Sequence, residues 1–203
     1  MIRLYFESIM KTKSKNPSTL GQAFFYGISK RRNYRKAFQY LLDAAALGYV
    51  HAQNLVGYCY SLGLGVTKSK KAAAFWYKQA ANAGHLEALT NLGLFYERGE
   101  GVRKNSRKAF ALYKRAAELG DPVGQRKVGI GYIEGWGTKR DPKEGMNWFR
   151  KAARKGDLEA QYILGSLYKD DENTKPNKTL ARLWLDKAAK RGHKRAKTAL
   201  KTL

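Results

Sequence analysis

The chain has 203 residues, of which 43% are hydrophobic, and it carries 40 basic against 16 acidic residues, for a net charge of +24. This composition excludes a disordered chain, and no window approaches 18 consecutive apolar residues, so no transmembrane helix is expected. The positive charge favours an acidic partner, which can be nucleic acid, anionic lipid or an acidic protein.

The N-terminal segment, residues 1–13, precedes the first regular pattern. It places a short apolar piece, IRLYFESI, before the lysines, whereas a signal peptide places its positive charge first. We therefore expect a cytoplasmic protein that is not secreted by the general pathway. The segment is interpreted as a cap on the folded body, and insertion into an anionic membrane is the alternative.

Two series of small residues then run along the chain at a fixed step of 36 residues. In the first, an Ala-Ala pair is followed three residues later by glycine, at Gly48, Gly84, Gly120, Gly156 and Gly192. In the second, glycine follows Leu or Val, at Gly21, Gly57, Gly93, Gly129 and Gly165. Two series in phase predict a single domain, 1–203, in which one unit occurs five times, at about 14–49, 50–85, 86–121, 122–157 and 158–197.

The second unit illustrates the expected local structure. Apolar residues between positions 52 and 60 recur at three- and four-residue steps, which predicts a first helix. Gly63 and Gly65 end it, since glycine readily adopts positive φ at a helix C-terminus. Thr67 or Ser69 can then cap a second helix. One pair of helices cannot bury its apolar face alone, so the units must stack.

The glycines of the second series have a predicted packing role. Gly57 and its equivalents lack a side chain, so the second helix of a unit can approach the first closely. Trp76, Trp148 and Trp184 are expected to fill the space between neighbouring helix pairs.

The units share a chained motif, Ala-x-x-x-Leu-Gly-x-x-Tyr, then Gly-x-Gly-Val, then Lys-Ala-x-x-Trp-x-x-x-Ala-Ala-x-x-Gly, which residues 84–120 follow closely. In this motif the chain resembles the Sel-one-like repeat family, a relative of the tetratricopeptide repeats. The resemblance implies an all-α fold, a right-handed α-solenoid of five 36-residue helix-turn-helix repeats. It also implies a binding scaffold, used typically in bacterial signalling, host interaction or effector complexes.

In tetratricopeptide-like solenoids the first helices line a concave face, and alignment with the family gives the expected groove positions. The predicted groove residues are Phe25, Tyr26, Asn54, Tyr58, Leu94, Arg98, Arg126, Ile130, Ile133 and Tyr162. Exposed aromatic and aliphatic side chains at successive repeats suit an extended peptide or a partner helix. Burial by repeat-to-repeat packing is the alternative for some of them.

Basic residues gather in the predicted turns between the first and second helices. This predicted basic edge consists of Arg31, Arg32, Lys68, Lys70, Arg103, Lys104, Arg107, Lys139 and Arg140. The N-termini of the second helices lie there too, so cations gain nothing from the helix dipole, and the edge suits anions. A solvated charged loop in each repeat is the alternative. A second basic set, which includes Lys155 and Arg191, lies near the C-termini of second helices and complements their dipoles.

No catalytic pattern is found. Of the three histidines, His51, His85 and His193, the last two occupy the same link position in different units, and no His-x-x-His or cysteine cluster supports a metal site. Cys59 is the lone cysteine and is interpreted as a packing residue. There is no phosphate-binding Gly-x-x-x-x-Gly-Lys loop and no Gly-x-Ser-x-Gly elbow. We therefore expect a protein that is not an enzyme and takes no cofactor, metal or small-molecule substrate.

The leading hypothesis is a protein–protein interaction scaffold that binds an acidic partner protein or peptide through the concave groove and the basic edge. A bacterial adaptor or immunity protein is one use that the family resemblance implies. RNA binding by the basic edge is the first alternative. Association with an anionic membrane is a further alternative, although a membrane is not the expected partner.

Overall fold

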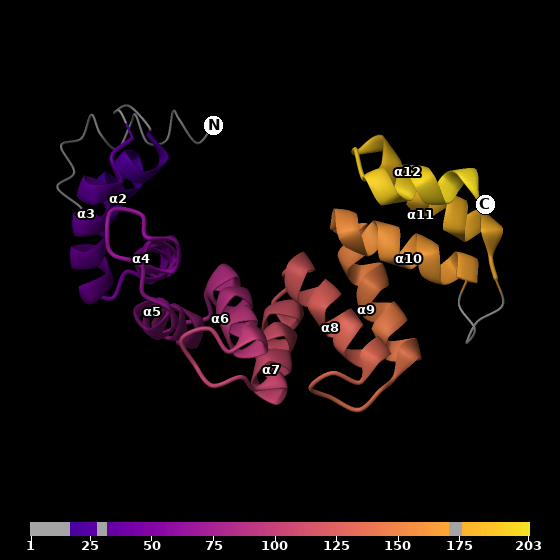
Figure 1. Cartoon of the computed structure of the whole chain (residues 1–203), viewed down its shortest axis with the longest axis horizontal. Helices are drawn as coiled ribbons and strands as arrows, with labels where there is room; N and C mark the ends of the chain where they lie inside the picture. Colours follow the sequence, from indigo (N-terminus) through magenta and orange to yellow (C-terminus); the bar gives the residue numbers. More distant parts are fainter. Residues whose placement is uncertain (1–16, 28–31, 171–175) are drawn as a thin grey trace. The chain divides into compact units, whose positions relative to one another are not determined.

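The computed structural model describes residues 17–27, 32–170 and 176–203, and in this part of the chain it contains eleven helices and no strand. The helices are α2 (Pro17–Tyr26), α3 (Tyr34–Ala46), α4 (Val50–Leu62), α5 (Lys70–Asn82), α6 (Leu86–Arg98), α7 (Ser106–Glu118), α8 (Pro122–Glu134), α9 (Pro142–Arg154), α10 (Leu158–Asp170), α11 (Lys178–Lys190) and α12 (Lys194–Lys201) (Figure 1). The expected N-terminal cap, 1–13, and Arg31 lie outside the described residues.

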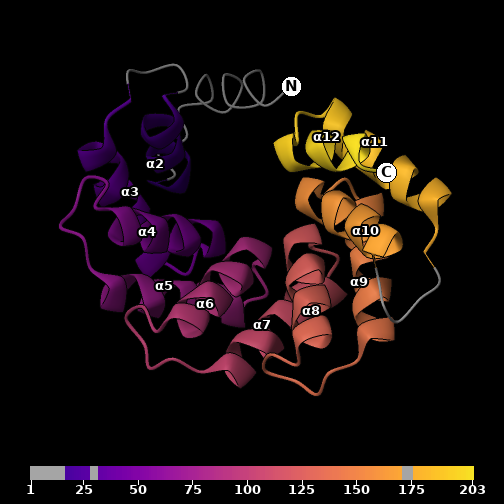
Figure 2. The same cartoon turned by 45° about the vertical axis from the view of Figure 1, so that its right-hand side comes forward.

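The helices belong to two compact units, Met1–Lys104 and Asn105–Leu203, which we call the N-unit and the C-unit. In the N-unit, each helix from α2 to α6 packs against the next one in sequence. In the C-unit, the same holds from α7 to α12 (Figure 2). The N-unit and the C-unit are thus each a stack of the helix pairs that the repeated motif predicts.

Polar caps and glycines set the limits of the helices. In the second repeat α4 ends at Gly63, which adopts a left-handed φ of 80°. Ser69 caps α5, because its hydroxyl accepts a hydrogen bond from the backbone N–H of Ala72 at 3.2 Å. The structure therefore selects Ser69 over Thr67 as the cap. Equivalent side chains cap the second helices elsewhere, at Asn33, Asn105, Asp141 and Asn177.

The series that contains Gly57 has the predicted packing role. A Cβ atom on Gly57 would lie 2.8 Å from the ring of Tyr77, on the second helix of the same repeat. The same crowding recurs between Gly21 and Leu41, Gly129 and Phe149, and Gly165 and Leu185. Close approach of the two helices within a repeat therefore depends on the missing side chain.

The second glycine of each Gly-x-Gly turn has a role that the sequence did not reveal. Gly65 has φ +73°, and a Cβ atom there would collide with the backbone carbonyl of Tyr34, at the start of the preceding repeat's second helix. A Cβ atom on Gly101 would likewise collide with the backbone carbonyl of Lys70, and one on Gly137 with that of Ser106. This glycine is therefore a contact between repeats as well as part of a turn.

The core of each repeat is built from the alanine pairs and the aromatic side chains between them. Ala80 and Ala81 are almost fully buried, and so is Tyr77 on the same helix. Cys59 is also fully buried, and burial raises the pKa of its thiol to about 12. The thiol is therefore protonated at neutral pH, in keeping with the expected packing role.

Candidate protein-interaction surface

The most exposed of the predicted groove residues with described side chains lie in the N-unit. Tyr26 at the end of α2 is 45% exposed and Tyr58 on α4 is 40% exposed. Leu62, one turn beyond Tyr58, is 52% exposed. The ring of Phe25 joins the two tyrosines, with centroid distances of 5.0 Å to Tyr26 and 6.1 Å to Tyr58. We call Tyr26, Tyr58 and Leu62 the tyrosine patch.

Phe25 does not face a groove as predicted. It is buried, and its ring makes an edge contact with Tyr34 at 5.6 Å within the first hydrophobic cluster of the N-unit. The reason is its position on α2, which directs it between the helices of the first repeat. Phe25 therefore packs against both tyrosines of the patch on their buried side.

Asn54 was also predicted to line the groove, and this prediction is wrong. It is buried, and its Nδ2 donates to Oε2 of Glu87 at 3.0 Å. Its Oδ1 accepts from Nδ2 of Asn91 at 3.5 Å. A buried amide needs such partners, and they lie on α6 of the next repeat. Asn54 thus joins two repeats and is not available to a partner protein.

In the tyrosine patch, Tyr26 is kept neutral by its surroundings, which include the carboxylate of Glu87. Burial, Glu87 and Tyr58 all raise the pKa of Tyr26, with burial the largest cause. The patch is therefore an uncharged, partly apolar surface at neutral pH. On α6 the predicted Leu94 is half-buried, and Arg98 is exposed with Nη1 3.7 Å from Oε1 of Glu100.

In the C-unit the predicted groove residues take part mainly in repeat packing. Nε of Arg126 donates to Oδ1 of Asp157 at 2.9 Å, so its charge is already paired. Ile130 and Ile133 are half-buried against the hydrophobic cluster of the C-unit. Tyr162 stacks on His193, with ring centroids 4.6 Å apart. All four residues are half-buried, and for Ile130, Ile133 and Tyr162 this favours the alternative interpretation, packing within the stack of repeats.

The sequence analysis did not identify the polar contacts between repeats, although glutamines that recur at multiples of 36 residues indicate some of them. Three glutamines, 36 or 72 residues apart, donate to carbonyls at the end of the preceding second helix: Gln53 to Ala45, Gln125 to Ala117 and Gln161 to Ala153. Lys155 and Arg191 likewise donate to the carbonyls of Gly120 and Gly156 in the preceding links. These two cations thus neutralise the helix C-terminus of the repeat before their own.

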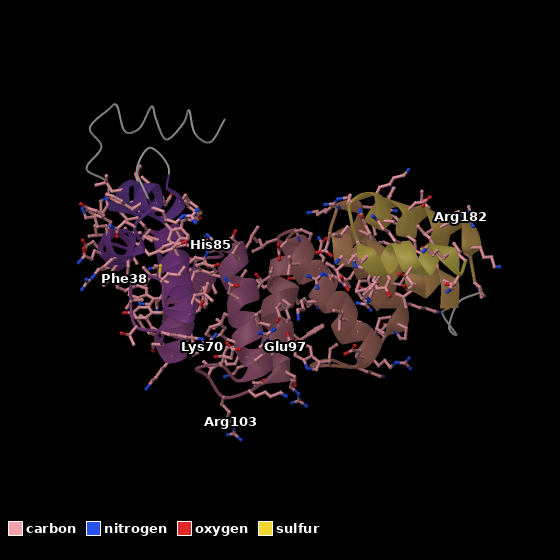
Figure 3. The ribbon with its side chains drawn as sticks, turned by 45° about the horizontal axis from the view of Figure 1, so that its top comes forward. Phe38, Lys70, His85, Glu97, Arg103 and Arg182 are labelled. Atoms are coloured by element: carbon pink, nitrogen blue, oxygen red, sulfur yellow. The ribbon has the colours of Figure 1, made fainter. Side chains whose placement is uncertain are left out.

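The described part of the basic edge is mostly exposed. Its exposed members are Arg32, Lys68, Arg103, Lys104, Arg107, Lys139 and Arg140. Arg103 extends from the loop after α6 (Figure 3). Three members have structural partners: Arg32 donates to the hydroxyl of Tyr34 at 3.4 Å, Lys70 pairs with Glu100 in the next repeat, and Arg140 donates to the carbonyl of Ile133 at 3.0 Å. Arg32, Lys70 and Arg140 are therefore less available to a partner than the other members.

Part of the edge in the C-unit is hollowed. Arg107 and Lys139 line a polar pocket of about 360 Å³ beside the N-terminus of α7. Backbone of the turn at Gly135 and Gly137 forms the rest of the wall, together with Ser106 and Thr138.

Helix pairs that recur every 36 residues define an α-helical repeat protein of the solenoid class. The family model described as Sel1 repeat matches residues 20–49, 50–85, 86–121, 122–157 and 158–193. The chain therefore belongs to the Sel1 repeat family, whose repeats generally serve as protein-interaction scaffolds and not as enzymes.

Solved structures of bacterial proteins share this fold. A Sel1 repeat protein from Oxalobacter formigenes is 30% identical with a TM-score of 0.85, over 96% of this chain and 84% of its own. The protective antigen c5321 of uropathogenic Escherichia coli is 29% identical with a TM-score of 0.84. The match covers 98% of this chain but only 43% of that protein. Immunity protein PA5087 of Pseudomonas aeruginosa, at 21% identity and a TM-score of 0.58 over 87% of this chain and 67% of its own, shows the fold alone. No curated protein matches the chain.

Two negative findings concern the described residues only. None of their helices is both long and apolar enough to span a bilayer. Within the same residues, no three or more histidine, cysteine or acidic side chains come together in a way that would hold a metal ion.

Proposed function

We propose that this Sel1 repeat protein is a non-enzymatic scaffold that binds an acidic partner protein, with the tyrosine patch as its docking surface and the basic edge as its source of attraction. The observation that carries the proposal is the exposure of Tyr26, Tyr58 and Leu62 on the first helices of two successive repeats. Tyrosines with an apolar neighbour are typical centres of protein interfaces.

The charge of the protein supports an acidic partner. In the N-unit, Lys68 lies in the loop between α4 and α5, and Arg103 and Lys104 lie in the loop after α6. All three are exposed, in a chain of net charge +24. Such a field speeds the approach of a negatively charged protein, while the neutral patch provides the desolvated contact. A bacterial adaptor or immunity protein is the specific use we propose, because it requires capture of a second protein and no catalysis.

Removal of the two tyrosines should weaken the partner complex by about 30-fold for each side chain, since a tyrosine buried at an interface centre contributes about 2 kcal/mol or more. The experiment compares the wild type with Tyr26→Ala/Tyr58→Ala. Partners captured by the wild type are purified, and their dissociation constants are measured by titration calorimetry.

The matched control for this experiment is Phe75→Ala. Phe75 is an aromatic side chain on α5 that is 54% exposed and therefore as accessible as the two tyrosines. We expect this variant to bind the partner like the wild type. Equal losses of affinity for both variants, or an unchanged affinity for the tyrosine variant, would contradict the tyrosine patch as the docking surface.

The basic edge should act on the rate of association. Arg103→Ala/Lys104→Ala is expected to slow association about tenfold at low salt and to change dissociation little, because exposed charges act mainly before contact. Stopped-flow measurements at two salt concentrations test this expectation. A captured partner that disappears on nuclease treatment would contradict the proposal and favour RNA, whose binding falls steeply with salt.

A further inference from the structure

Two contacts between the first helix of a repeat and the link that follows the same repeat occupy equivalent positions but contain different chemical groups. In the N-unit, Nδ1 of His51 on α4 lies 3.2 Å from Nε2 of His85, the residue before α6. Exactly three repeats, or 108 residues, further on, Oε2 of Glu159 on α10 lies 3.0 Å from Nε2 of His193, the residue before α12. The same joint is thus a histidine pair in one unit and a carboxylate–histidine pair in the other.

The histidine pair can hold only one proton between its facing nitrogens. At 3.2 Å one ring donates and the other must accept through a lone pair, so the two rings cannot both be protonated without bringing two N–H groups together. The other nitrogen of His85, Nδ1, is buried and has no hydrogen-bond partner in the described part of the chain. A charged His85 would therefore have one N–H facing His51 and one buried N–H without an acceptor.

The groups around the histidine pair do not compensate for added positive charge. Glu87, at the start of α6, is the carboxylate that acts on His85, but it already accepts the amide hydrogen bond of Asn54. Glu87 also acts electrostatically on Tyr26 of α2 and Tyr77 of α5, and both are neutral phenols. Burial first, and His51 second, lower the pKa of His85, against a smaller opposing effect of Glu87.

The joint in the C-unit satisfies both nitrogens of its histidine. Nε2 of His193 lies 3.0 Å from Oε2 of Glu159, whose Oε1 also lies 3.4 Å from Nη1 of Arg195. Nδ1 of His193 accepts from the backbone N–H of Ala196 and so caps α12, which leaves the ring proton on Nε2 to donate to the carboxylate. A neutral His193 therefore has a partner at each nitrogen, whereas Nδ1 of His85 has none within the described residues.

We propose that the His51–His85 contact is an acid-labile joint at the link between the second and third repeats. The pH range follows from the direction of the shift at His85. Its pKa in the folded chain is below the ordinary value of about 6.5, so the unfolded or opened joint binds more protons in this range. The stabilising contribution is complete above about pH 6.5 and is lost as the pH falls towards the lowered pKa.

The test is hydrogen exchange of the full chain at pH 7.5 and 5.5, corrected for the intrinsic rate and resolved by peptide. We expect protection in α4, α5 and α6 to fall by up to about tenfold per pH unit in the window below pH 6.5, the limit for uptake of one proton. No loss of protection around His51 over this pH range would overturn the proposal.

Two substitutions copy groups that the chain uses at the equivalent positions. His51→Glu recreates the Glu159–His193 arrangement in the N-unit, and His85→Asp places there the residue found as Asp121 and Asp157. Each should abolish or reverse the acid response of α4–α6, because a carboxylate now faces the remaining histidine. His193→Gln is the control and should leave that response unchanged. Persistence of the wild-type response in both N-unit variants would refute the role of the pair.

Discussion

Replacing Gly65 by alanine is expected to lower the free energy of unfolding by about 3 kcal/mol or more. Two effects add at this position. The backbone has φ +73°, which costs a residue with a Cβ about 1–2 kcal/mol. The added Cβ would also collide with the carbonyl of Tyr34, so α3 and α4 would have to separate or the turn would have to rearrange. Urea denaturation followed by circular dichroism measures the loss.

Gly48→Ala separates these two effects. Gly48 has φ +87°, but a Cβ atom there would meet nothing within 4 Å. We therefore expect only the conformational cost, about 1–2 kcal/mol. If Gly65→Ala and Gly48→Ala destabilise the protein equally, close packing between repeats at the turn is not what requires glycine.

Asp157→Ala should lower the free energy of unfolding by about 2–4 kcal/mol, the second large effect. The side chain of Asp157 is 9% exposed and its Oδ1 accepts two hydrogen bonds, from Nε of Arg126 at 2.9 Å and from the backbone N–H of Ala160 at 2.7 Å. Alanine would remove the cap of α10 and leave a partly buried guanidinium without its carboxylate. Thermal and urea unfolding both report this loss.

Asp141→Ala is the matched control, since Asp141 only caps a helix. Its Oδ1 accepts from the backbone N–H of Glu144 at 3.0 Å, at an exposed position. Loss of such a cap costs about 1 kcal/mol. A loss for Asp157→Ala no larger than that for Asp141→Ala would mean that the pair with Arg126 contributes nothing to the joint between the fourth and fifth repeats.

The local structure was predictable because it depends on neighbours in the sequence. Ser69 caps α5 through a backbone group three residues ahead, and Gly63 ends α4 through its own φ. Gly57 could be assigned to close helix packing because its step of 36 residues recurs with that of the alanine pairs. Periodicity of 3.6 and 36 residues was therefore sufficient for the helices, the repeat limits and the family.

The surface was less predictable, because exposure depends on what the next repeat places beside a residue. Position on the first helix suggested a groove for Tyr58 and Asn54 alike. Tyr58 is exposed, whereas Asn54 is buried under Glu87, a residue 33 positions further on. A helical pattern says which face a residue occupies, but it does not say whether a side chain from another repeat covers that face.

The sequence by itself thus determined the unit, its helices, its caps and the excess of positive charge. Only the tertiary structure decided which polar residues join repeats and which remain for a partner. It paired His51 with His85 and Glu159 with His193, and it placed Gly65 against the carbonyl of Tyr34. These contacts join residues about 31 to 34 positions apart, and their partners are chosen by the geometry of stacking, which no local pattern of residues encodes.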